Sequence, residues 1–231
     1  GQTVAIASCV SRHETRGERW GGLTATQVNN DVYLYQSIDG GQTWDLNNPK
    51  NLTQFIGPVD DVPNDTMRAF ADCSIEFTSQ NKLRAAFTVA HGNPVTGESF
   101  YESRLYSYIE DDDGLEWWSQ IHFQPDPGYP PEAWGRTVDR PSLFFDSLTG
   151  ILWCMFRSFG GGEHDYSQES GIGNGDLYIS ASPPGKYNGL LWAKPVNITW
   201  TKWETAGGAG VGQSASELDG ALAINSNGPY L

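Results

Sequence analysis

Carboxylates, arginines and aromatic side chains gather in a few polar segments of this chain. Carboxyl groups can exchange the protons needed to cleave a glycosidic bond, guanidinium groups suit a carboxylate, and aromatic rings suit a sugar face. The residues proposed for catalysis are Glu14, Asp72, Tyr101, Glu163 and Asp165, and those proposed for substrate binding are Arg12, Arg16, Trp20, Arg140 and Tyr166. The alternative for each of them is a solvated surface side chain.

An internal repeat arranges these segments along the chain. Residues 31–44 align without a gap on residues 104–117, an offset of 73 residues, and a third copy opens at residues 176–182 before it ends at Pro183. Each copy begins with a β-rich run that carries a tyrosine at the same position. Internal repeats indicate a repeat architecture, and four strands in about 73 residues describe a propeller blade with long loops.

Each repeat predicts four antiparallel strands, A to D, joined by a tight turn, a long loop and a second turn. With 27 Gly and 13 Pro residues in 231, the chain favours many short elements. The predicted fold is all-β, a β-propeller with about three four-stranded blades, part of a six- to eight-bladed ring. One propeller region spans 1–231: strands B–C–D of a first blade in 1–56, a second blade in 68–124, a third in 139–204 and the start of a fourth in 219–231.

The long loops of such a repeat all lie on one face. They are the B-to-C segments 12–30, 91–103 and 158–175, and the D-to-A segments 56–71, 124–139 and 205–218. Asp72, Arg140 and Asp219 stand at equivalent positions at the start of strand A. Long loops on a rigid scaffold are where binding and catalysis usually reside. The polar side chains of these loops, with Asp72, Arg140 and Asp219, are therefore expected to line one binding site.

One turn of the repeat carries a recognisable motif. Ser37, Asp39, Gly41, Thr43 and Trp44 match the Asp-box, Ser-x-Asp-x-Gly-x-Thr-Trp, at every fixed position, and the second copy keeps Asp112, Gly114 and Trp117. The chain therefore resembles the sialidase-like Asp-box β-propellers. The expected role of the box is structural: Asp39 accepts hydrogen bonds from its own turn, Gly41 adopts a positive φ, and Trp44 packs between sheets.

The resemblance implies a sialidase-type glycoside hydrolase that has an arginine cluster, a tyrosine nucleophile activated by a glutamate, and an aspartate acid/base. No Phe/Tyr-Arg-Ile-Pro motif precedes the first Asp-box, and no Tyr/Glu pair is assigned by motif. Two functions therefore stay open: a glycoside hydrolase, and a non-catalytic adhesion, recognition or assembly module that keeps the same scaffold.

Composition limits the partners. The chain has 28 acidic and 14 basic residues, a net charge of −14, which argues against nucleic acid, and no apolar run reaches the ~20 residues of a membrane span. Acidic turns around residues 60–65, 110–113 and 163–176 could bind Ca²⁺ or be simply solvated, and no other metal or cofactor is predicted. Cys9, Cys73 and Cys154 allow at most one disulfide, and buried free thiols are expected.

Sequons and chain ends bear on location and assembly. Asn51, Asn64 and Asn197 begin Asn-x-Thr sequences, and together with the resemblance they favour a secreted, extracellular protein. Asn51 and Asn197 occupy equivalent repeat positions, so a shared turn is the alternative explanation. Three repeats do not close a ring, so the open strand edges need either the remainder of a larger propeller or further copies of this chain.

Overall fold

The computed structural model describes residues 3–11, 30–53, 66–92, 99–111, 113–125, 136–159, 173, 175–199, 223–225 and 228–230. These residues form β-strands and contain no helix. The described part of the chain therefore has no helix that could span a bilayer. The strands are β1 (Val4–Ser11), β2 (Asn30–Ser37), β3 (Lys50–Asn51), β4 (Thr66–Phe77), β5 (Leu83–Gly92), β6 (Ser99–Glu110), β7 (Glu116–Gln124), β8 (Val138–Asp146), β9 (Ile151–Phe159), β10 (Gly175–Ser182), β11 (Val196–Asn197), β12 (Ala223–Asn225) and β13 (Gly228–Tyr230). All pairings are antiparallel. The prediction of an all-β antiparallel fold is confirmed.

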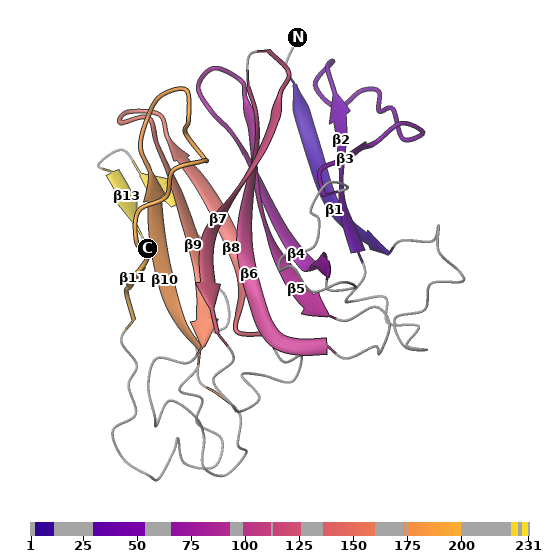
Figure 1. Ribbon diagram of the computed structural model, residues 1–231. Helices are drawn as coiled ribbons and strands as arrows, with labels where there is room; N and C mark the ends of the chain where they lie inside the picture. The colour runs from indigo at the N-terminus through magenta and orange to yellow at the C-terminus, as the bar shows by residue number, and fades with distance from the viewer. Residues whose placement is uncertain are drawn as a thin grey trace.

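The strands form three sheets. Strands β1, β2, β4, β5, β6 and β7 follow one another in a curled seven-stranded sheet, with β3 paired to β2. The join between β2 and β4 is a single residue pair, Asn30 with Ala69. Strands β8 to β11 form a second sheet in chain order, and β12 pairs with β13. In Figure 1 the strands β1–β3, β4–β7 and β8–β11 succeed one another across the molecule from right to left.

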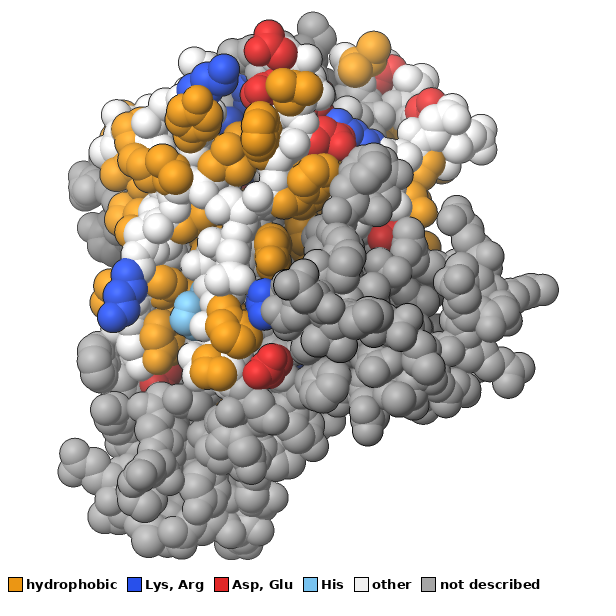
Figure 2. All heavy atoms as spheres, viewed as in Figure 1, with side chains coloured by type: hydrophobic (Ala, Val, Ile, Leu, Met, Phe, Trp, Pro, Cys, Tyr) orange, Lys and Arg blue, Asp and Glu red, His pale blue; other side chains and the backbone are white. Residues whose placement is uncertain are grey.

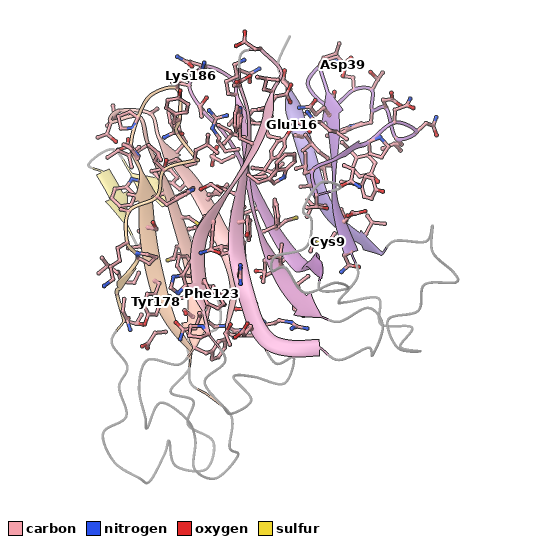
Figure 3. All side chains as sticks on the ribbon, in the orientation of Figure 1. Cys9, Asp39, Glu116, Phe123, Tyr178 and Lys186 are labelled. Carbon is pink, nitrogen blue, oxygen red and sulfur yellow. The ribbon has the colours of Figure 1, made fainter. Side chains whose placement is uncertain are left out.

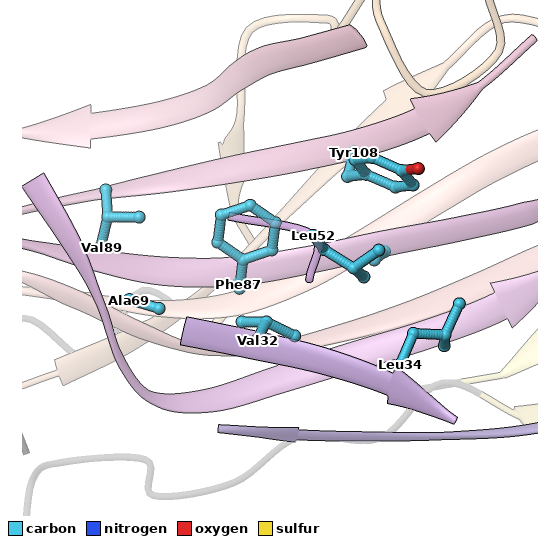
Figure 4. Packing of buried hydrophobic residues seen from close by; sticks show 8 residues of the cluster. Val32, Leu34, Leu52, Ala69, Phe87, Val89 and Tyr108 are labelled. Carbon is cyan, nitrogen blue, oxygen red and sulfur yellow. The ribbon is translucent and has the colours of Figure 1, made fainter. Parts of the chain in front are cut away.

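Two apolar cores lie on opposite faces of β4–β7. Successive side chains of a strand point to opposite faces, and β5 shows this alternation directly. Ala85, Phe87 and Val89 enter one core with Val32 of β2, whereas Ala86 enters the other core with β8 and β9 residues. Figure 4 shows the first core, which Leu34, Leu52, Ala69 and Tyr108 complete. The chain therefore packs β1–β3 and β8–β11 against the two faces of the central strands.

Antiparallel pairing separates two ends of the sheets. At one, here called the turn end, the pairs Phe77–Leu83, Glu110–Glu116 and Asp146–Ile151 close tight connections. At the other, the distal end, lie the pairs Ser11–Asn30, Thr66–Gly92 and Phe159–Gly175. Exposed large apolar side chains sit mainly in the connections of the turn end: Ile38, Leu46, Leu115, Leu148, Tyr187 and Leu191. Figure 2 shows hydrophobic side chains mixed with both charges over that end.

Candidate functional site

Two β-bulges at matching places in β4 and β8 build the candidate site. The β4–β5 register shifts between Ala69 and Cys73, and the β8–β9 register shifts between Asp139 and Ser142. A bulge leaves residues out of the ladder and re-aims their side chains, and proline is tolerated there because it has no N–H to pair. Asp72 occupies the first bulge, and Arg140, followed by Pro141, occupies the second. Both bulges lie toward the distal end.

The structure brings Asp72 and Arg140 into direct contact. The backbone N–H of Arg140 donates a hydrogen bond to Oδ2 of Asp72, and the Thr88 hydroxyl donates a second at 3.2 Å. Arg140 has a φ of 55°, a left-handed conformation that is uncommon for a side-chain-bearing residue and is often found at functional sites. Oδ1 of Asp72 is inaccessible to solvent and has no hydrogen-bond partner among the described residues.

The environment of Asp72 favours its protonated form. Burial, followed by the negative charge of Asp139, raises the pKa of Asp72 from 3.8 to about 6. The hydrogen bonds from Arg140 and Thr88 act in the opposite direction and do not compensate. A carboxyl group with a pKa near working pH can both donate and accept a proton, which is the property required of a general acid/base.

A buried ion pair supports the second bulge. Arg157 of β9 donates from Nε to Oδ1 of Asp139 at 2.8 Å and from Nη2 to Oδ2 at 2.6 Å, and the two residues are only 1% and 3% exposed. The guanidinium also lies 4.7 Å from the Phe159 ring centroid. These two hydrogen bonds hold the Asp139 carboxylate beside Asp72, so that the negative charge of Asp139 acts on the Asp72 carboxyl. The sequence analysis did not nominate either residue, although an arginine within the apolar run 151–159 was an available signal.

Arg136 is a further functional candidate that sequence reasoning missed. It is 2% exposed and lies two residues before β8, and its guanidinium lies 4.6 Å from the centroid of the Phe70 ring in the β4 bulge. The contact joins β4 to the segment that leads into β8, close to the Asp72–Arg140 hydrogen bond between β4 and β8. In the sequence, nothing distinguishes Arg136 from other loop charges.

Most other nominated residues lie outside the described residues. These are Arg12, Glu14, Arg16, Trp20, Glu163, Asp165 and Tyr166, together with Asp219, Asn64 and the turn residue Asp112. The backbone of Tyr101 belongs to β6, but its side chain is not among those that the structure describes. Of the nominated catalytic and substrate-binding residues, the structure therefore brings together Asp72 and Arg140.

Among the described residues, a hydrogen-bonded Tyr/Glu pair lies at the turn end. The Tyr108 hydroxyl donates to Oε1 of Glu116 at 2.9 Å, and Lys50 of β3 contacts Glu116 at 2.8 Å and Glu110 at 2.5 Å. Burial raises the pKa of Tyr108, which opposes formation of a nucleophilic phenolate. This pair joins β3 to β6 and β7, and we assign it a structural role.

Hydrogen bonds hold the turn between β2 and β3. Oδ1 of Asp39 accepts from the backbone N–H groups of Gln42 and Thr43 at 3.0 and 2.9 Å, and Oδ2 accepts from the Thr43 hydroxyl at 2.6 Å. The Ser37 hydroxyl donates to Asp39 and accepts from the Gly41 N–H at 2.9 Å. These bonds, with that from Ser37 first, lower the pKa of Asp39. Gly41 has a φ of 89°, and the Trp44 indole N–H donates to its carbonyl at 3.0 Å.

The second and third repeats vary this turn. In the second, the carboxylate of Asp111 accepts from the N–H groups of Asp113 and Leu115 at 3.0 and 2.9 Å. The Trp117 indole N–H donates to the same carboxylate at 3.3 Å. Asp111 thus caps the turn of the second repeat, and Gly114 keeps a positive φ of 76°. Asp112, which the gap-free alignment places opposite Asp39, lies outside the described residues. In the third, Ser182 accepts from the Gly189 N–H at 2.7 Å, as Ser37 does from Gly41.

Two of the Asn-x-Thr sequences are structural devices. Thr53 accepts from the Val32 N–H at 3.0 Å and donates to Asp31 at 2.9 Å, while its own N–H donates to Asn51 at 2.9 Å. The third repeat has the same bonds. The Thr199 hydroxyl accepts from the Leu177 N–H at 3.0 Å and donates to Asp176 at 3.4 Å, and the Thr199 N–H donates to Asn197 at 3.1 Å. Nδ2 of Asn197, the atom that would carry a glycan, donates to Asp176 at 2.6 Å.

Metal-binding chemistry finds little support in the parts of the chain that the structure describes. They hold no group of three or more His, Cys, Asp or Glu side chains arranged around a common point. Among the acidic turns, Glu110 contacts Lys50, Asp111 caps its turn, and Asp176 accepts from Asn197. Each of these three carboxylates thus has a protein partner, while residues 60–65, Glu163 and Asp165 lie outside the described residues.

No protein-family model matches the chain, and no curated protein shows significant similarity to it.

Proposed function

We propose that this protein is a sialidase-like Asp-box β-propeller that acts on glycans outside the cell. In this proposal it is a glycoside hydrolase in which Asp72 is the general acid/base and Arg140 contributes to binding of an acidic sugar. The observation that carries the proposal is the contact between these two bulge residues, in which Asp72 keeps a buried carboxyl whose pKa is raised to about 6.

The strand pairing supports the propeller part of the proposal. Strands β4–β7 and β8–β11 are two four-stranded antiparallel meanders in chain order, and β1–β3 pair as the last three strands of such a unit would. The two cores lie between successive units, as face-to-face packing of blades requires. Closing a ring of six to eight blades then needs the remainder of a larger propeller or further copies of the chain.

The location of the site supports the catalytic part. Asp72 and Arg140 lie toward the distal end of the described strands. In the sequence, the long polar segments that carry the other nominated acids and arginines connect strands at the ends that form this distal end. In this proposal the exposed side chain of Arg140 provides the contact to an anionic group of the substrate, and the carboxyl of Asp72, with its raised pKa, exchanges the proton.

Hydrolysis of a panel of fluorogenic glycosides, including a sialoside, tests the proposal. We expect turnover by the wild-type chain and a loss of about 100-fold or more in kcat for Asp72→Asn, a size typical of losing a general acid/base. The matched control is Glu76→Gln, a carboxyl-to-amide change on the same strand outside the bulge. It should leave turnover unchanged.

Two outcomes would overturn the catalytic proposal. One is the absence of wild-type turnover on every glycoside while glycan binding is retained, which would make the protein a non-catalytic recognition module. The other is an equal loss of turnover in Asp72→Asn and Glu76→Gln, which would place the effect in the fold of β4. Circular dichroism of both variants reports whether that fold is kept.

A further inference from the structure

Cys9 and Cys73 come from different repeats and face the same core. Along β1, Ala5, Ala7 and Cys9 alternate toward the core that contains Val32, and Cys73 of β4 packs against that core from the central strands. Strands β1 and β4 are in contact although they are not paired. Figure 3 places Cys9 well below Asp39, toward the distal end.

The two thiols also influence each other: the interaction with Cys9 lowers the pKa of Cys73, and the interaction with Cys73 raises the pKa of Cys9. Both residues are partly exposed, which leaves a path for a small reagent. Cys154 differs because it is fully buried in the other core. The three cysteines are free thiols in this structure.

We propose that Cys9 and Cys73 are a redox pair that closes to a disulfide in an oxidising thiol pool. The bond would tie the edge strand β1 directly to β4. It would reinforce the place where the seven-stranded sheet is held by the single pair Asn30–Ala69. Because Cys73 directly follows Asp72, the crosslink would also anchor the bulge that carries the candidate site.

The chemistry is a thiol–disulfide exchange with a small disulfide such as oxidised glutathione. Cys73 attacks as the thiolate, because the interaction with Cys9 lowers its pKa. Its sulfur bonds to one glutathione sulfur, and the other leaves as a thiolate. Cys9 then gives up its proton and attacks the Cys73 sulfur, which releases the second glutathione. Two protein thiols are oxidised, one glutathione disulfide is reduced to two thiols, and both protons end in the glutathione pool.

Intact mass and non-reducing peptide mapping test the pair. The reduced chain is incubated with mixtures of oxidised and reduced glutathione, then quenched with acid. We expect the monomer to lose the mass of two hydrogen atoms and to yield one crosslinked peptide pair containing Cys9 and Cys73. The oxidised chain should also unfold at a higher urea concentration than the reduced chain, because a crosslink between distant residues restricts the unfolded state.

Variants separate this pair from random oxidation. Cys9→Ser and Cys73→Ser should each lose the crosslink and carry glutathione on the remaining partner, whereas the control Cys154→Ala should form the crosslink as the wild type does. Mixed disulfides without a Cys9–Cys73 peptide, a crosslink that involves Cys154, or a bond between two chains would each overturn the proposal. None of these readouts depends on glycosidase activity.

Discussion

The backbone N–H of Arg140 in β8 donates a hydrogen bond to the carboxylate of Asp72 in β4, 68 residues away in the chain. Each residue occupies the bulge of the first strand of a four-stranded unit. The contact therefore joins equivalent places of successive repeats, and it holds a buried carboxyl beside the ion pair of Asp139 and Arg157.

Asp72 should make stability depend on pH. Its pKa rises from 3.8 in the unfolded chain to about 6 in the fold, so the protonated form stabilises the fold below pH 4 and this contribution disappears as pH rises to about 6. The groups that set this pKa are Asp139, Arg140 and Thr88. We expect the wild type to lose on the order of 3 kcal/mol relative to Asp72→Asn across that window. Urea unfolding of both chains from pH 4 to 7 measures the difference, and parallel curves would contradict it.

Breaking the buried ion pair should be costly. Arg157→Met leaves the buried carboxylate of Asp139 without its guanidinium partner. Asp139→Asn removes the negative charge that faces Arg157. Each variant should lower the free energy of unfolding by about 3–5 kcal/mol. Asp139→Asn should also lower the pKa of Asp72, because it removes a neighbouring negative charge. The double variant Asp139→Leu with Arg157→Met should recover part of the loss in urea unfolding. Additive losses would show that the two residues do not act as a pair.

The Ser37 hydroxyl should matter more than an ordinary turn serine. Ser37→Ala removes the acceptor of the Gly41 N–H and a donor to Asp39. Because Ser37 is only 2% exposed, we expect the free energy of unfolding to fall by about 1–2 kcal/mol. Ser147→Ala changes an exposed turn serine and should stay within about 0.5 kcal/mol of the wild type. Thermal denaturation of both variants gives the comparison, and equal effects would remove the special role.

Thr53 and Thr199 should have matching effects. Each hydroxyl accepts a hydrogen bond from a backbone N–H, of β2 for Thr53 and of β10 for Thr199, and donates one to an aspartate. Thr53→Val and Thr199→Val should therefore each lower the free energy of unfolding by about 1–2 kcal/mol. Valine keeps the shape, and the loss therefore reports the hydrogen bonds. Chemical denaturation measures both variants. A loss in one and not in the other would mean that the two repeats do not share this anchor.

The turn chemistry and strand alternation of this protein could be predicted from sequence because they are local. Asp39 reaches only to residues 37–43, so its motif already contains every partner that it needs. The alternation along β5 follows from the two-residue period of a strand, and the repeat indicated which runs are equivalent. The all-β class and most strand positions came from these signals. That Asp111 caps the turn of the second repeat was seen only in the structure.

Long-range pairing was decided only by the tertiary structure. A bulge changes which face a side chain meets, and two bulges must form before Asp72 can accept from Arg140. The partnership of Asp139 with Arg157 depends on the register of β8 against β9, and that of Cys9 with Cys73 depends on packing between repeats. The sequence by itself determined which residues form strands and turns, since those contacts span a few positions. Which distant side chains meet was decided by sheet register and packing, because these depend on the whole chain at once.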